Sequence, residues 1–137
     1  MNLNGLMKQI IEQNPEFKHL EDKRVHFFPL PCRRIFGGYV LPFDRIVLFG
    51  EPDESMLIFS ISRELEHMNY RHEYGLLKAM YEFTFNRREM ERRATRRGIS
   101  TLKKIRPGYL WWMERMINNY RCSVNPIERL IYKLNYR

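Results

Sequence analysis

The residues with the clearest chemical potential lie in one short segment, 62–67, whose sequence is SRELEH. In zinc peptidases with the motif H-E-x-x-H, two histidines one helical turn apart bind the metal, and the glutamate activates a water molecule. Glu64 and His67 occupy the positions of that glutamate and of the second histidine, whereas Arg63 occupies the position of the first. Because a guanidinium group keeps its proton in proteins, Arg63 cannot ligate zinc. The segment therefore predicts a peptidase-like helix that lacks its usual metal site.

Arg63 can instead provide a positive charge of its own. Residues i and i+4 share one face of a helix, so Arg63 and His67 are expected to face the same pocket. The guanidinium can then take the place of the metal and pair with Glu64. Without a Lewis acid, peptide hydrolysis is expected to fail. The alternative interpretation is that Glu64 is a surface carboxylate and His67 a histidine at the edge of the core.

A second arrangement would retain a metal site. If the helix ends near Asn69, His72 can fold back beside His67 as a replacement ligand of an open zinc site. On a continuous helix, however, residues five positions apart point about 140° away from each other. We therefore expect no bound cofactor, with zinc as the exception if this degenerate site survives.

The elements that must position these residues follow from hydrophobic periodicity and from turn residues. They are, in order, an amphipathic helix at 3–13, strands at 24–30, 35–41 and 45–49, long helices at 54–70 and 76–97, and two C-terminal helices within 107–137. The second long helix is expected to break between Thr84 and Asn86 and to be followed by Gly98 as its C-terminal cap. Gly37-Gly38 predicts either a bulge or a close backbone approach.

This order of elements predicts one α+β domain over residues 1–137. An N-terminal helix comes first, a small three-stranded sheet follows, and the C-terminal half is all helical. Because the three strands are close in sequence, we expect them to pair as an antiparallel meander.

In this setting the chain resembles the ImmA/IrrE family of small metallopeptidases of phages and mobile elements. The resemblance covers about residues 24–105 and is carried by the segments VHFFPLP, DRIVLF, SRELEHM and MERRATRRG. It implies a zincin-like core, with residues 107–137 as additional C-terminal helices. It also implies the role of general base for Glu64 and of metal ligands for His67 and Glu91. Glu91 would then be an alternative to Glu64 as the partner of Arg63, and His67, His72 and Glu91 would be the three protein ligands of the degenerate zinc site. The missing first histidine is the main departure from the family pattern.

The chain is strongly basic, with a formal net charge of +8. Arg88, Arg92 and Arg96 recur every four residues, and Arg93 with Arg97 forms an adjacent row, so two basic stripes are predicted on one helix. Such a surface can contact nucleic-acid phosphates without sequence specificity, or an acidic protein. The alternative is a solvated helix face.

Composition excludes several classes. The 137 residues are 44% hydrophobic, which is too apolar for a disordered chain, and no apolar run is long enough to cross a membrane. The N-terminus does not have the pattern of a secretory signal. Cys32 and Cys122 are far apart and form no CxxC pair, which fits a reducing compartment, so we expect a cytoplasmic protein. There is no phosphate-binding loop, dinucleotide fingerprint or GxSxG elbow.

Two functions follow from these observations. The first is an ImmA/IrrE-like protein that would be a zinc metallopeptidase if active, but that the sequence favours as a pseudoenzyme. It would act through a protein partner, which in this family is often a transcription repressor. The second is a basic binding protein that contacts nucleic acid or inhibits a nucleic-acid enzyme. Salt dependence would mark the second function, and sensitivity to a chelator would mark an active peptidase.

Overall fold

The computed structural model describes residues 3–31, 36–50 and 54–108. The elements are helix α1 (Leu3–Gln13), the 3-10 helix η1 (Pro15–Leu20), strands β1 (Val25–Pro29) and β2 (Phe36–Val40), the 3-10 helix η2 (Leu41–Phe43), strand β3 (Arg45–Gly50), and helices α2 (Glu54–Tyr74), α3 (Leu76–Phe85) and α4 (Arg87–Ile105). The predicted α+β class and the order of its elements are confirmed. The helices predicted beyond residue 108 lie outside the described residues.

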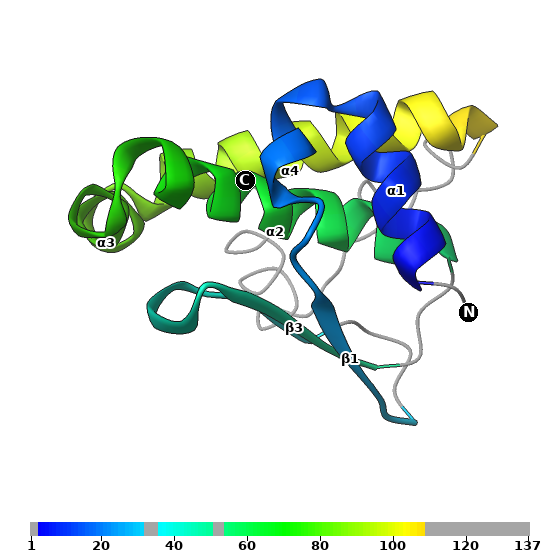
Figure 1. Cartoon of the computed structure of the whole chain (residues 1–137), viewed down its shortest axis with the longest axis horizontal. Coiled ribbons are helices and arrows are strands. Elements are labelled where there is room, and N and C mark those ends of the chain that lie inside the picture. Colours follow the sequence, from blue (N-terminus) through cyan, green and yellow to red (C-terminus); the bar gives the residue numbers. More distant parts are fainter. Residues whose placement is uncertain (1–2, 32–35, 51–53, 109–137) are drawn as a thin grey trace, which may run out of the picture.

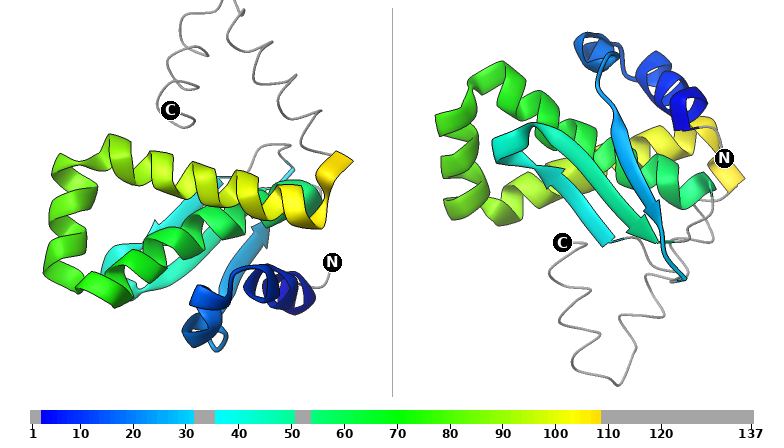
Figure 2. Two further views of the ribbon diagram at one scale, coloured as in Figure 1. Left: turned by 90° about the horizontal axis from the view of Figure 1, so that it is seen from above. Right: turned by 60° about the horizontal axis from the view of Figure 1, so that its bottom comes forward.

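Helix α2 is the centre of the fold. It packs on β2 and β3 on one side and on α1, α3 and α4 on the other, and α4 returns along it after the short α3 (Figures 1 and 2). Its predicted apolar stripe is buried, from Leu57 and Ile58 to Met68. Unusually for a helix, it also buries Glu64 and His67. Because buried ionisable groups are costly without partners, the elements around α2 must supply those partners.

The sheet differs from the predicted antiparallel meander, which is wrong. β1 pairs in parallel with β3, with Val25 opposite Ile46, while β2 pairs with β3 in the antiparallel sense, so the strand order is β1-β3-β2. Pro29 in β1 has no N–H to donate, which suits an edge strand. β3 contains no proline and buries Ile46 and Leu48, so it takes the central position. β2 is consequently an edge strand.

The helix boundaries also differ in part from the prediction. α2 continues to Tyr74, and the predicted break before α4 is confirmed at Asn86. Gly98, however, lies inside α4 and does not end it. A Cβ atom at Gly98 would lie 2.7 Å from Cδ2 of Phe59 and 3.0 Å from Cγ of Arg63. Glycine is therefore needed there because α4 approaches α2 closely beside Arg63.

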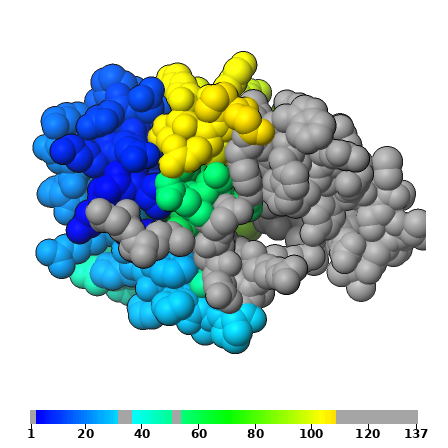
Figure 3. Space-filling model, turned by 90° about the vertical axis from the view of Figure 1, so that its right-hand side faces the viewer, coloured from blue at the N-terminus to red at the C-terminus, as the bar shows by residue number. Residues whose placement is uncertain are grey.

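A buried polar network joins α4 to the rest of the helical layer. Arg97 donates from Nε to Glu66 on α2 at 2.9 Å and from Nη1 to the side-chain oxygen of Asn14 at 3.0 Å. Asn14, between α1 and η1, donates in turn to Thr101 at 2.9 Å. Figure 3 shows α1 beside the end of α4 on this face of the molecule. The network gives the buried carboxylate of Glu66 its partners and fixes the position of α4 along α2.

The described part of the chain contains no helix whose length and apolar character would suit a membrane span.

Candidate functional site

A pocket of about 310 Å³ lies between β2, α2 and the α3–α4 junction. Four of the residues predicted from sequence line it together, namely Arg63, Glu64, His67 and Glu91. The other lining residues are Gly37, Gly38, Tyr39, Phe83, Arg87 and Met90. The surface-carboxylate and core-edge-histidine interpretation therefore does not describe these residues, because both side chains face a shared pocket.

Glu64 is held against the edge of β2. The backbone N–H of Tyr39 donates to Oε2 of Glu64 at 2.8 Å, and a Cβ atom on Gly38 would lie 3.3 Å from that oxygen. Gly38 thus leaves room for the carboxyl group, which confirms the expected close backbone approach at the glycine pair. Burial raises the pKa of Glu64 above its ordinary value, because it disfavours the charged form more than the neighbouring charges of His67 and Arg63 favour it.

Arg63 and Glu91 form an ion pair across the α2–α4 interface. Nη2 of Arg63 donates to Oε2 of Glu91, while Oε1 of Glu91 lies 3.4 Å from Nε2 of His67. Burial by itself would raise the pKa of Glu91, but the contacts with His67 and Arg63 outweigh it and leave that pKa below its ordinary value. Of the two carboxylates that the sequence offered to Arg63, the structure pairs it with Glu91.

Two nitrogen atoms of this cluster are buried and have no hydrogen-bond partner among the described residues. They are Nε of Arg63 and Nδ1 of His67. The ring of Phe83 packs edge-on against the His67 ring with their centroids 5.1 Å apart, and Arg87 contributes an exposed cation at the rim. Buried polar atoms usually have partners, so the pocket holds unused capacity for a polar ligand.

His72 does not join the cluster, and the prediction that it folds back beside His67 is wrong. Because α2 continues as a helix to Tyr74, His72 is carried round to a different face, where its Nε2 lies 2.7 Å from Oδ2 of Asp44. Burial would raise the pKa of Asp44, but hydrogen bonds with Tyr39 and His72 outweigh it and lower that pKa. His72 thus helps to hold the β2–β3 turn on α2.

The cluster does not fit a zinc ion in the manner of the peptidase motif. Within residues 3–31, 36–50 and 54–108, no three His, Cys, Asp or Glu side chains are grouped so that they could hold a metal ion. His67 and Glu91 supply two potential ligands, but the cation that Glu91 contacts is the guanidinium of Arg63. We therefore derive no metal-dependent step for this site.

Comparison with known proteins found no matching family model, no matching curated protein and no matching solved structure. The ImmA/IrrE resemblance consequently remains a prediction from the sequence motifs.

The two basic stripes predicted on α4 differ in their contacts and in their exposure. Arg97 and Arg93 turn toward Glu66, at 2.9 Å and 3.4 Å, and belong to the interior network. The row of Arg88, Arg92 and Arg96 is exposed. The second row is therefore the more available basic surface, because the buried carboxylate of Glu66 already engages the first row, in which the side chains of Arg93 and Arg97 are 38% and 25% exposed.

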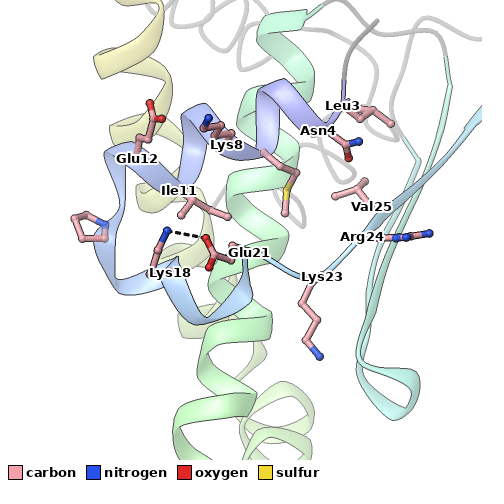
Figure 4. A pocket seen from close by; sticks show the side chains of 12 residues that line it. Leu3, Asn4, Lys8, Ile11, Glu12, Lys18, Glu21, Lys23, Arg24 and Val25 are labelled. Atoms are coloured by element: carbon pink, nitrogen blue, oxygen red, sulfur yellow. Dashed lines mark ion pairs between the residues drawn. The ribbon is translucent and has the colours of Figure 1, made fainter.

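A larger hollow, of about 1120 Å³, lies between α1, η1 and the start of β1 (Figure 4). Its wall combines apolar side chains such as Met7 and Ile11 with charged ones, and Lys18 pairs with Glu21 at 2.7 Å along it. The described residues that line it include no histidine or cysteine and none of the predicted site residues. We therefore place the candidate site at the Arg63–Glu91 pocket.

Six lining residues escaped the sequence analysis as site residues, namely Gly37, Gly38, Tyr39, Phe83, Arg87 and Met90. The glycine pair was the one local signal, since two glycines inside a strand indicate that something approaches the backbone closely. Tyr39 acts through its backbone N–H, and Phe83 and Arg87 reach the pocket because the chain turns at Asn86. No sequence spacing reports contacts of these kinds.

Proposed function

We propose that this protein is a metallopeptidase-like pseudoenzyme that binds a peptide segment of a protein partner and does not cleave it. The observation that carries the proposal is the guanidinium of Arg63 paired with Glu91, beside Glu64 and His67, in the pocket where the motif would need a metal. A guanidinium cannot polarise a carbonyl or activate water as a Lewis acid does. The partner expected from the family resemblance is a transcription repressor of a phage or mobile element.

The edge of β2 supports peptide binding. Among the described residues β2 has β3 on one side only, and its backbone on the other side reaches the pocket, where the N–H of Tyr39 donates to Glu64. An extended peptide can add to such an edge through its main chain. Within the glycine pair, Gly37 is exposed and presents no side chain, whereas Glu64 fills the space beside Gly38.

The charges of the pocket favour an acidic or carbonyl-rich segment. Arg63 and Arg87 both line it, and Glu91 is the carboxylate whose pKa is lowered, whereas the pKa of Glu64 is raised. The positive charge of Arg87 at the rim has no ion-pair partner among the described residues. A partner carboxylate can therefore bind there without displacing an internal ion pair.

Metal content tests the loss of the metal site. We would measure zinc per chain by elemental analysis in untagged wild-type protein and in Arg63→His, with Arg96→His as a matched control on exposed α4. We expect about one zinc per chain in Arg63→His alone, since it would place two histidines one turn apart near Glu91. About one zinc in the wild type, lost in His67→Ala, would contradict the proposal and call for a chelator-sensitive peptidase assay.

Peptide binding is tested separately at the rim. Peptides would be selected from a random library on the wild-type protein and then measured against Arg87→Glu and Arg88→Glu. These neighbours are both exposed, but only Arg87 lines the pocket. We expect Arg87→Glu to weaken binding about tenfold or more and Arg88→Glu to leave it nearly unchanged. Equal effects of the two variants would argue against the pocket as the binding site.

The second candidate, contact with nucleic acid, draws on the exposed row of Arg88, Arg92 and Arg96. If these three side chains contact phosphates, the logarithm of the affinity for duplex DNA should fall with the logarithm of the salt concentration with a slope of about −3. Replacing all three by serine should then remove most of the binding. Affinity that does not respond to these substitutions would exclude this surface.

A further inference from the structure

Helix α3 presents an apolar face that nothing in the described part of the chain covers. The exposed fractions are 83% for Leu77, 50% for Met80, 60% for Tyr81 and 75% for Phe85. On its inner side only Ala79 is fully buried. α3 lies at one end of the molecule, where it links α2 to α4 (Figures 1 and 2). Contiguous exposed apolar residues of this kind usually mark an interaction surface.

The exposed residues form a stripe along α3. Leu77, Tyr81 and Phe85 are spaced four residues apart and so fall on one face, over a length of about 12 Å, with Met80 beside them. The rings of Tyr81 and Phe85 are in contact, with their centroids 5.1 Å apart. A stripe of this width fits another helix better than it fits a flat surface.

The charges on α3 argue against an acidic partner. α3 carries one lysine and one glutamate, so it is neutral in a chain whose formal net charge is +8. Within the described residues neither Lys78 nor Glu82 takes part in an ion pair. Lys78 lies over the ring of Tyr74, and Glu82 accepts a hydrogen bond from Asn86. A partner matched to this face is itself apolar and carries both signs of charge.

A second copy of α3 meets these requirements when it packs antiparallel. Lys78 and Glu82 lie one turn apart on the same flank of the stripe, and reversal of the second helix sets each Lys78 opposite the other copy's Glu82. The stripe is centred on Tyr81 and the charged pair on position 80, so in a dimer centred on Tyr81 each Lys78 lies about 3 Å along the axis from the other copy's Glu82. The side chain of Lys78 spans such an offset easily.

We propose that two copies of this protein associate through α3 in a two-fold symmetric dimer. The interface is isologous, with Leu77 of each copy beside Phe85 of the other and two equivalent Lys78–Glu82 pairs along one flank. The inference rests on α3 alone and is independent of what the Arg63–Glu91 pocket binds.

Sedimentation of the full chain over a range of concentrations tests the dimer. We expect the wild type to dimerise, and Leu77→Glu to be monomeric at every concentration because it places a carboxylate within the stripe. Leu30→Glu, at an exposed leucine away from α3, should behave as the wild type does. A wild-type chain that stays monomeric at high micromolar concentration overturns the proposal, as does a dimer that Leu77→Glu leaves intact.

A charge-reversal pair tests the antiparallel arrangement. Lys78→Glu and Glu82→Lys should each weaken the dimer about tenfold or more, because each variant sets like charges opposite one another twice. An equimolar mixture of the two variants should restore dimerisation, since positions 78 and 82 then carry opposite charges in both contacts between the copies. Restoration also shows that both variants fold. Failure of the mixture to dimerise would overturn the antiparallel pairing.

Discussion

Substitutions of Arg63 and Glu91 should have strongly coupled effects on the free energy of unfolding. Removing one partner of a fully buried pair costs about 3–5 kcal/mol, because the other charge is left uncompensated. The two side chains are 15% and 21% exposed, so we expect a smaller loss of about 2–3 kcal/mol for Glu91→Gln. Arg63→Met should cost about 1–2 kcal/mol, since Glu91 keeps its contact with His67.

The double variant separates this coupling from packing. With both charges removed, the loss should fall below the sum of the single losses by about 1–2 kcal/mol. We would measure the free energy of unfolding by urea denaturation at pH 7. The slope of this free energy against urea concentration should be the same in the variants as in the wild type. The exposed pair of Arg106 and Glu54, with side chains 43% and 48% exposed, supplies the control, and its coupling should be under about 1 kcal/mol. Additive losses at Arg63 and Glu91 would refute the view that the guanidinium holds this pocket together.

Three further predictions concern single residues. Glu64→Gln should stabilise the protein at neutral pH, because the raised pKa of Glu64 costs stability as the pH rises above the ordinary value of 4.5. The free energy of unfolding measured as a function of pH should show that this gain shrinks below pH 4.5. A loss of stability at pH 7 would contradict the prediction. Asp44→Asn keeps a side chain that tolerates the left-handed backbone but should lose about 1–3 kcal/mol at pH 7; because the pKa of Asp44 is lowered, the difference from the wild type should close as the pH falls below 3.8. Gly98→Ala should lower the melting temperature, since a clash with Phe59 costing about 1–3 kcal/mol exceeds the roughly 1 kcal/mol gained in helix propensity, whereas Ser100→Ala on the exposed side of α4 should not lower it.

The expected gain in stability of Glu64→Gln bears on the proposed function. A carboxyl group buried at a cost in stability is more readily explained by a role in binding than by a role in folding. If Glu64→Gln is more stable but binds selected peptides less well, the residue belongs to the binding site. Equal binding by both proteins would leave Glu64 as a remnant of the motif.

Local sequence was sufficient for the features that depend on neighbours along the chain. The apolar stripe of α2, the break at Asn86 and the close approach at Gly38 follow from helical periodicity and from backbone preferences. The four-residue spacing of Arg63 and His67 put them on one face, and both line the pocket. These are short-range consequences of backbone geometry, so a single sequence contains them.

Tertiary structure alone decided the features that depend on competition between distant groups. Arg63 pairs with Glu91 and not with Glu64, since Glu64 is held at β2 by the backbone N–H of Tyr39. Arg97 is used internally because Glu66 is buried and needs a cation. The parallel pairing of β1 with β3, which places β3 in the centre of the sheet, likewise joins strands that are not consecutive in sequence. Each choice depends on the desolvation of a group by segments far away in sequence, and the spacing of residues along the chain carries no record of it.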